Sequence, residues 1–169
     1  MVQVECMSLL KSILITIGIF VFIGLLGWGA FLYNQEQKAD KTLASLKDLY
    51  NKGNYEDVVT KVDENVLFSH REDFLLIKLE SLVELGEFYE GETVAKDLLK
   101  LNSKNAKCYY FLGLVYYNTS NLTKSIDSFK KAINLQPKNT DYKLNLARTL
   151  TQNGNDNEAI KVYKQIMNE

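Results

Sequence analysis

Apolar and polar residues follow two different patterns along this chain. From Ile13 to Leu32 there are 20 consecutive residues without a charge, and Thr16 is the only clearly polar side chain among them. After Tyr33 the apolar residues recur at helical spacing and are interrupted by short polar turns, such as Asn153-Gly154-Asn155-Asp156. The two patterns predict an all-α chain, in which one long apolar helix precedes an array of amphipathic helices.

The apolar run is long enough to cross a bilayer as a helix. Trp28 and Tyr33 lie toward its far end, where amphipathic rings favour the membrane interface. We therefore expect a short tail over residues 1–11, a transmembrane helix over residues 12–33 and a repeat domain over residues 34–169. The membrane would be contacted through residues 13–32.

A cleaved signal peptide is the alternative to this anchor, because Gly27-Trp28-Gly29-Ala30 places small residues near a cleavage point. The apolar run is longer than the usual export core of about 7 to 15 residues, which favours the anchor. The lysines on the two sides, Lys11 before the run and Lys38, Lys41 and Lys47 after it, do not settle the orientation. An extracytoplasmic repeat domain is preferred, a cytoplasmic one stays open, and so does a translation start at Met7.

A group of aromatic and small residues near the middle of the chain has the spacing of two antiparallel helices that pack closely. Its members are Tyr109, Leu112, Gly113, Tyr116, Ser125, Phe129, Ala132 and Pro137. Gly113 and Ala132 have little or no side chain, so large rings such as Phe129 can fill the space between the helices. Pro137 ends the second helix.

These residues resemble the signature of the tetratricopeptide repeat (TPR), in which only Ser125 departs from the usual Ala. A shift by one repeat period maps Ser125 onto Ala159 and Phe129 onto Tyr163, so a second unit follows the first. Weaker units precede it. The resemblance implies an α-α superhelical solenoid of about three to four helical hairpins, in units over residues 38–71 (degenerate), 72–105, 106–139 and 140–169.

In stacked hairpins of this kind the first helices line the concave side, and residues outside the signature point into it. The resemblance therefore implies a groove that binds a peptide or a partner helix. The expected groove residues are Leu76, Glu80, Lys107, Tyr110, Leu114, Tyr117, Leu144 and Arg148. The alternative for some of them is simple packing against a neighbouring helix.

The last predicted helix carries Ile160 and Met167, and no capping helix follows it in the sequence. Because uncovered solenoid ends are poorly soluble, we expect these two residues to contact a second copy or another protein laterally.

The remaining composition excludes several functions. Lys and Arg number 20 against 21 Asp and Glu, which leaves no basic surface for nucleic acid. His70, Cys6 and Cys108 are isolated from one another, so no catalytic, metal or cofactor site is expected. The abundance of Lys, Asn, Ile and Tyr is typical of an AT-rich genome, such as that of a bacterium. Together with the apolar run, it predicts a single-pass protein of a bacterial cell membrane.

The resemblance implies a membrane-anchored adaptor or assembly factor that is not an enzyme. The alternative is a structural subunit of a permanent envelope or membrane complex, with no exchangeable ligand.

Overall fold

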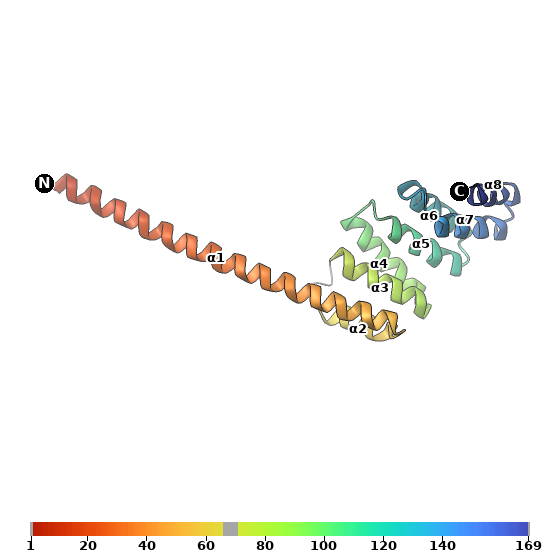
Figure 1. The fold of residues 1–169 in the computed structure, drawn as a ribbon, viewed down its shortest axis with the longest axis horizontal. Helices are drawn as coiled ribbons and strands as arrows, with labels where there is room; N and C mark the ends of the chain where they lie inside the picture. The colour runs from red at the N-terminus through yellow and green to blue at the C-terminus, as the bar shows by residue number, and fades with distance from the viewer. Residues whose placement is uncertain (1, 66–70, 169) are drawn as a thin grey trace. The chain divides into compact units, whose positions relative to one another are not determined.

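The structure is a computed structural model that describes residues 2–65 and 71–168, and for residues 2–17, 19 and 20 only the backbone. Every regular element in these residues is a helix (Figure 1). The helices are α1 (Val2–Asn51), α2 (Tyr55–Glu64), α3 (Glu72–Leu85), α4 (Phe88–Leu101), α5 (Ala106–Asn118), α6 (Leu122–Leu135), α7 (Thr140–Gln152) and α8 (Asp156–Met167). The predicted all-α fold is confirmed.

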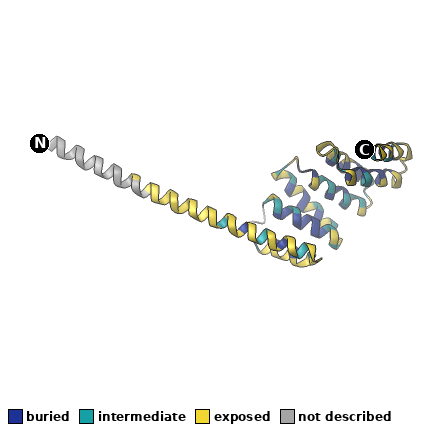
Figure 2. Cartoon of the chain, viewed as in Figure 1, coloured by how far each residue is buried: buried dark blue, intermediate teal, exposed yellow. Residues whose placement is uncertain are grey.

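The chain divides into two compact units, Met1–Thr42 and Leu43–Glu169, and α1 contributes residues to both. In the first unit the described side chains of the apolar run are exposed to solvent (Figure 2). The large ones are Val21, Phe22, Ile23, Leu25, Leu26, Trp28, Phe31 and Leu32.

Among the residues whose side chains are described, no helix combines the length and the apolar character that crossing a membrane requires. The transmembrane helix expected over residues 12–33 is therefore not supported by the structure. A span needs about 20 consecutive apolar residues. Within the expected run of residues 13–32, the side chains of residues 13–17, 19 and 20 lie outside the described ones.

The second unit is a series of helical hairpins. Its first helices α3, α5 and α7 begin at residues 72, 106 and 140, and its second helices α4, α6 and α8 begin at residues 88, 122 and 156, so both sets recur at one constant interval. Helix α2 packs on α3, α4 packs on α5, and α6 packs on α7, so each hairpin is covered by the next. The predicted solenoid of stacked hairpins is confirmed.

The turns inside the hairpins repeat as well. Each one contains a residue in the left-handed region of the backbone, namely Gly53 (φ 78°), Gly86 (φ 80°), Ser120 (φ 60°) and Gly154 (φ 78°). Glycine adopts this conformation without a steric penalty, whereas Ser120 carries a Cβ that is unfavourable there. These four residues therefore recur at regular spacing because each turn places one residue in the left-handed conformation.

The α5–α6 hairpin is held by close packing of Gly113 against the ring of Phe129. A Cβ at residue 113 would lie 2.6 Å from this ring, which is closer than real side chains allow. Ser125 is fully buried, and its hydroxyl donates a hydrogen bond of 2.8 Å to the Gly113 carbonyl. The departure from the usual Ala thus places a hydroxyl where a backbone acceptor satisfies it.

A buried lysine connects α2 to the hairpin formed by α3 and α4. Lys78 on α3 forms ion pairs with Asp63 of α2 at 2.7 Å and with Glu90 of α4 at 2.8 Å. Burial lowers the pKa of Lys78, but hydrogen bonds from the ammonium to Asp63 and Glu90 outweigh this and raise the pKa overall. Because burying a charge is costly without partners, this contact favours one arrangement of the three helices.

Candidate functional site

The eight residues expected in the groove all lie on first helices. Leu76 and Glu80 are on α3, and Leu144 and Arg148 are on α7. The others, all on α5, are Lys107, Tyr110, Leu114 and Tyr117. Helices α3 and α5 contact each other directly, so side chains from consecutive units are brought side by side. We call the surface formed by residues 43–51 of α1 together with α3, α5 and α7 the first-helix face.

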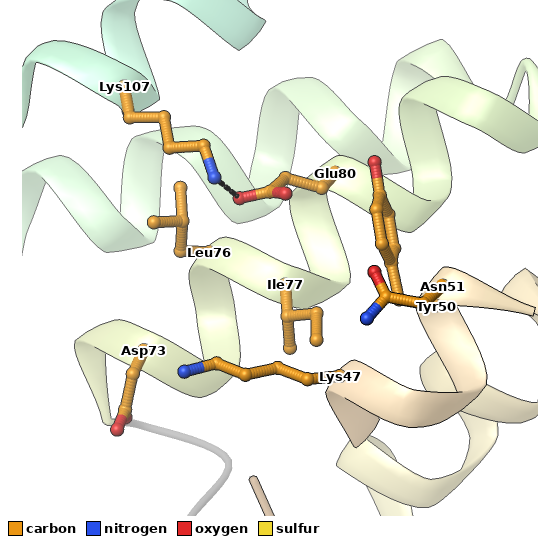
Figure 3. A pocket seen from close by; sticks show the side chains of 8 residues that line it. All are labelled: Lys47, Tyr50, Asn51, Asp73, Leu76, Ile77, Glu80 and Lys107. Atoms are coloured by element: carbon orange, nitrogen blue, oxygen red, sulfur yellow. Dashed lines mark ion pairs between the residues drawn. The ribbon is translucent and has the colours of Figure 1, made fainter. Parts of the chain in front are cut away.

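A pocket of about 460 Å³ opens at one end of the first-helix face (Figure 3). It brings together three of the expected residues, Leu76, Glu80 and Lys107. The other residues that line it are Lys47, Tyr50, Asn51, Asp73 and Ile77. Figure 3 shows Leu76 and Ile77 between the Lys107–Glu80 pair on one side and the Lys47 side chain on the other. The pocket therefore has an apolar floor with charged edges.

The charges in this pocket are balanced. Lys107 of α5 forms an ion pair with Glu80 of α3, whose side chain is only 11% exposed. Asp73 is paired with Arg71 at 3.0 Å. Since two bases, Lys47 and Lys107, and two acids, Asp73 and Glu80, line the pocket, neither strongly acidic nor strongly basic ligands are favoured by net charge.

Tyr50 contributes an aromatic wall to this pocket. Burial raises the pKa of Tyr50 to about 12, and the nearby carboxylates Glu80 and Glu84 act in the same direction. The phenol is therefore neutral at physiological pH and keeps its hydrogen-bond donor. Its ring also makes an edge contact with Tyr55, with 5.2 Å between the ring centroids.

Sequence reasoning missed Lys47, Tyr50 and Asn51, because the first unit lacks the aromatic and small-residue signature. The sequence did contain a usable signal, which is the spacing between Gly53 and Gly86, the glycines in the turns of two consecutive hairpins. Applied to α3, this spacing places Lys47 opposite Glu80 and Asn51 opposite Glu84. The first-helix face therefore extends one unit further toward the N-terminus than the expected residues indicated.

Tyr110 takes part in packing between consecutive units. Its ring stacks on Tyr142 of α7 with centroids 4.9 Å apart, and it lies 5.9 Å from the ring of Phe129. The amide of Asn145 donates a hydrogen bond of 3.3 Å to the Tyr110 hydroxyl. Burial raises the pKa of Tyr110, and Asp141 adds to this effect. Tyr110 is half-buried, so it both joins α5 to α7 and presents one edge on the first-helix face.

The other expected groove residues are spread along the first-helix face. Leu114 is half-buried and packs against two core clusters, one formed by α3, α4 and α5 and the other by α6, α7 and α8. Tyr117 and Leu144 are half-buried, whereas Arg148 is exposed. The structure thus gathers three of the eight residues in the pocket and distributes the other five over α5 and α7.

The two residues expected at the end of the array lie on α8. The side chain of Ile160 is 50% exposed, and that of Met167 is 84% exposed.

Reactive groups are few in the part of the chain that the structure describes. No cluster of His, Cys, Asp and Glu that could hold a metal ion occurs there. Burial raises the pKa of the Cys108 thiol to about 12, and its sulfur donates to the carbonyl of Ala95 at 3.4 Å. Cys108 is therefore an inert core residue. His70 and the side chain of Cys6 lie outside the described residues.

Comparison with protein families identifies two units of the solenoid. Residues 106–139 and 140–168 each match the tetratricopeptide repeat. The resemblance seen in the aromatic and small residues of α5 and α6 is therefore confirmed for these two units.

Similar proteins agree with this assignment. The chain is 32% identical over 91 residues to DnaJ homolog subfamily C member 7 of Homo sapiens, which covers 52% of the chain and 18% of that protein. It is 28% identical over 103 residues to a TPR repeat-containing protein of Methanocaldococcus jannaschii, covering 57% of the chain and 18% of that protein. The chain thus matches less than a fifth of the length of these relatives.

A solved structure shares the fold. MamA of Desulfovibrio magneticus RS-1, from residue 41 to its end, superposes with a TM-score of 0.72 at 22% identity, over 77% of this chain and 74% of that one. At this level of identity the similarity establishes the superhelical fold.

Proposed function

We propose that the repeat domain is an adaptor that binds a segment of another polypeptide on the first-helix face. The observation that carries the proposal is the pocket of about 460 Å³, in which an apolar floor of Leu76 and Ile77 lies between charged edges. Tetratricopeptide repeats are protein-interaction modules, and the extended surfaces of solenoids suit peptides and helices.

The composition of the first-helix face supports a ligand longer than one side chain. From the pocket, half-buried Tyr110, Leu114 and Leu144 continue the face over α5 and α7. An apolar residue of the ligand would occupy the pocket beside Tyr50. The residues that follow it would contact α5 and α7, and polar groups at the rim would fix the register.

Site-specific photo-crosslinking tests this proposal. A photo-reactive amino acid replaces Tyr117 on α5, and the matched control replaces Tyr89, an 86% exposed tyrosine on the second helix α4. We expect cross-linked partner proteins from position 117 and none from position 89. Equal cross-linking from both positions would contradict binding on the first-helix face.

The same experiment separates the adaptor from the structural subunit. An adaptor exchanges its ligands, so position 117 should capture several partners whose yield falls when a competing soluble peptide is added. A permanent subunit would give one stoichiometric neighbour that no peptide displaces.

Localisation at a bacterial cell membrane stays a prediction from the apolar run of residues 13–32. Alkaline carbonate extraction of cell membranes tests it, because an anchored chain stays with the lipid and a peripheral one is released. Protease accessibility of the repeat domain in intact cells then decides between an extracytoplasmic and a cytoplasmic orientation.

A further inference from the structure

The second helix α6 is covered by the first helix of the next hairpin. On α6, Ile126 and Phe129 belong to the same buried cluster as Leu146 and Leu150 of α7, and Ile133 packs against it. Ile126 is only 7% exposed as a result. The outer side of α6 is therefore an apolar surface built to receive another helix.

Helix α8 has the same surface without a cover from the described residues. A shift by one repeat period maps Ile126 onto Ile160 and Ile133 onto Met167, and these two side chains are 50% and 84% exposed. Tyr163, the equivalent of Phe129, is half-buried. Among the helices described, the one that packs on α8 is α7. Helix α8 therefore presents a row of apolar side chains that its equivalent α6 buries.

The charges on α8 indicate what covers this row. Asp156 lies four residues before Ile160, and Lys164 lies four residues after it. On an α-helix each is displaced by one turn along the axis and by about 40° around it, on opposite sides of Ile160. Neither of these charges has an ion-pair partner among the described residues. Ile160 is thus flanked by an acid one turn before it and by a base one turn after it.

We propose that α8 pairs with α8 of a second copy of this chain in an antiparallel arrangement. A two-fold axis through the pair places Ile160 against Ile160 of the second copy. The same axis brings Asp156 of each copy opposite Lys164 of the other, so two complementary ion pairs enclose the apolar contact. Met167 lies about two turns beyond Ile160, outside this central contact.

Head-to-tail stacking of copies is disfavoured by the other end of the array. In the first hairpin no large apolar side chain is exposed between residues 43 and 64 of the described chain. The exposed residues there are mainly polar or charged, among them Ser45, Asp48, Glu56, Asp57 and Lys61. Because an open filament needs two complementary ends, a closed dimer through α8 is favoured.

The interface is one face of a 12-residue helix. It is smaller than the ~800 Å² per partner of a standard stable interface, so the dimer forms reversibly with concentration.

Charge exchange tests the antiparallel pairing in the full-length chain by sedimentation velocity over a range of concentrations. In Asp156→Lys two bases face each other across the interface, and in Lys164→Asp two acids do. We expect each variant alone to dimerise at least tenfold more weakly than the unmodified chain. Mixed in equal amounts, the two variants form heterodimers with two acid–base pairs. One pair joins the unchanged Lys164 of the first variant to the unchanged Asp156 of the second, and the other joins the two substituted positions with their charges exchanged. Dimerisation of the mixture should therefore match that of the unmodified chain.

Matched controls separate this effect from misfolding and from contacts elsewhere. Lys161→Asp makes the same change of charge as Lys164→Asp at an exposed position on another side of α8, and it should leave dimerisation unchanged. Ile160→Glu should abolish the dimer in every mixture while the thermal unfolding curve by circular dichroism keeps its shape. A mixture that associates no better than either variant alone would overturn the antiparallel arrangement.

Cross-linking gives a second readout. In a Cys6→Ser background, Ile160→Cys should form a disulfide-linked dimer under mild oxidation, because the two sulfurs meet on the axis, and the remaining Cys108 is buried. Lys161→Cys in the same background should not. Equal yields from positions 160 and 161, or a chain that stays monomeric throughout, would rule the proposal out.

Discussion

The α3–α4 and α5–α6 hairpins reach the same close helix packing with opposite distributions of large and small residues. In α5–α6 the first helix provides Gly113 and the second provides Phe129, whose ring fills the space. In α3–α4 the first helix provides Leu79, and the second provides Gly91 and Ala95. A Cβ at Gly91 would lie 3.7 Å from Leu79, an ordinary contact.

This difference explains which units carry a recognisable signature. Residues 106–139 match the tetratricopeptide repeat, whereas the α3–α4 hairpin lies outside the matched residues. What the two hairpins share is that a large side chain on one helix meets a small one on the other. Close packing depends on the sum of the two volumes, so the large residue can come from either helix.

Removing the large residue tests whether the two hairpins depend on it equally. Phe129→Ala should lower the free energy of unfolding by about 3–5 kcal/mol, and Leu79→Ala by about 2–5 kcal/mol, because both side chains are fully buried. Urea unfolding followed by circular dichroism measures both. A loss under about 1 kcal/mol for either residue would show that its hairpin is held by other contacts.

Adding a methyl group to the small residue distinguishes the two hairpins by sign. Gly113→Ala places a Cβ 2.6 Å from the Phe129 ring and should cost about 1–3 kcal/mol from overpacking, reduced by up to about 1 kcal/mol of helix propensity. Gly91→Ala meets Val115 at 3.4 Å and should be neutral or stabilising by up to about 1 kcal/mol. Urea midpoints of the two variants give the comparison, and a destabilised Gly91→Ala would contradict it.

The junction between the two hairpins should be sensitive to high pH. Tyr116 of α5 donates a hydrogen bond of 2.9 Å to Glu92 of α4. Burial raises the pKa of Tyr116 from 10.0 to about 12, and the bond to Glu92 adds to this. A raised pKa stabilises the fold fully below the unfolded value of 10.0, and that contribution is lost as the pH rises through about 12.

Tyr116→Phe should therefore cost about 1 kcal/mol at pH 7 through the lost hydrogen bond, and less above about pH 11. Thermal unfolding of both proteins between neutral pH and about pH 12 measures this. Tyr50 also titrates near pH 12 and is unchanged in both proteins, so it serves as the internal reference. Parallel stability curves over the whole range would contradict the assignment.

The smallest expected effect concerns the turns. Three of the four described hairpins place glycine in the left-handed turn position, and α5–α6 places Ser120 there. Ser120→Gly should stabilise the protein by up to about 1 kcal/mol, because the Cβ penalty is removed. Differential scanning calorimetry measures the shift in Tm. Gly154→Ser is the reciprocal change, and it should destabilise by a similar amount.

The repeat and its packing could be predicted from the chain because they depend on residues at fixed spacing. Gly113 and Phe129 predicted the α5–α6 contact, and the polar cluster Asn153-Gly154-Asn155-Asp156 predicted a turn in which the structure places Gly154 in the left-handed conformation. The hydrogen bond from Ser125 to the Gly113 carbonyl was not predictable, because a departure from a signature does not reveal which acceptor its hydroxyl finds.

The binding face shows the same limit. Sequence spacing placed Leu76, Glu80 and Lys107 on first helices, and the structure brings them into one pocket. It did not reveal that Tyr50 and Lys47 complete this pocket, because the first hairpin lacks the signature. Nor did it show that Tyr110 stacks on Tyr142, since that contact depends on how far one hairpin is rotated against the next.

The sequence by itself determined the helices, their turns and the order in which the hairpins follow each other, because period, glycine placement and side-chain volume act over short distances along the chain. Only the tertiary structure decided which side chains from different hairpins share the pocket and that the ring of Tyr110 stacks on Tyr142. These features arise from contacts between segments a full repeat apart in the sequence, whose relative positions depend on the packing of every side chain between them.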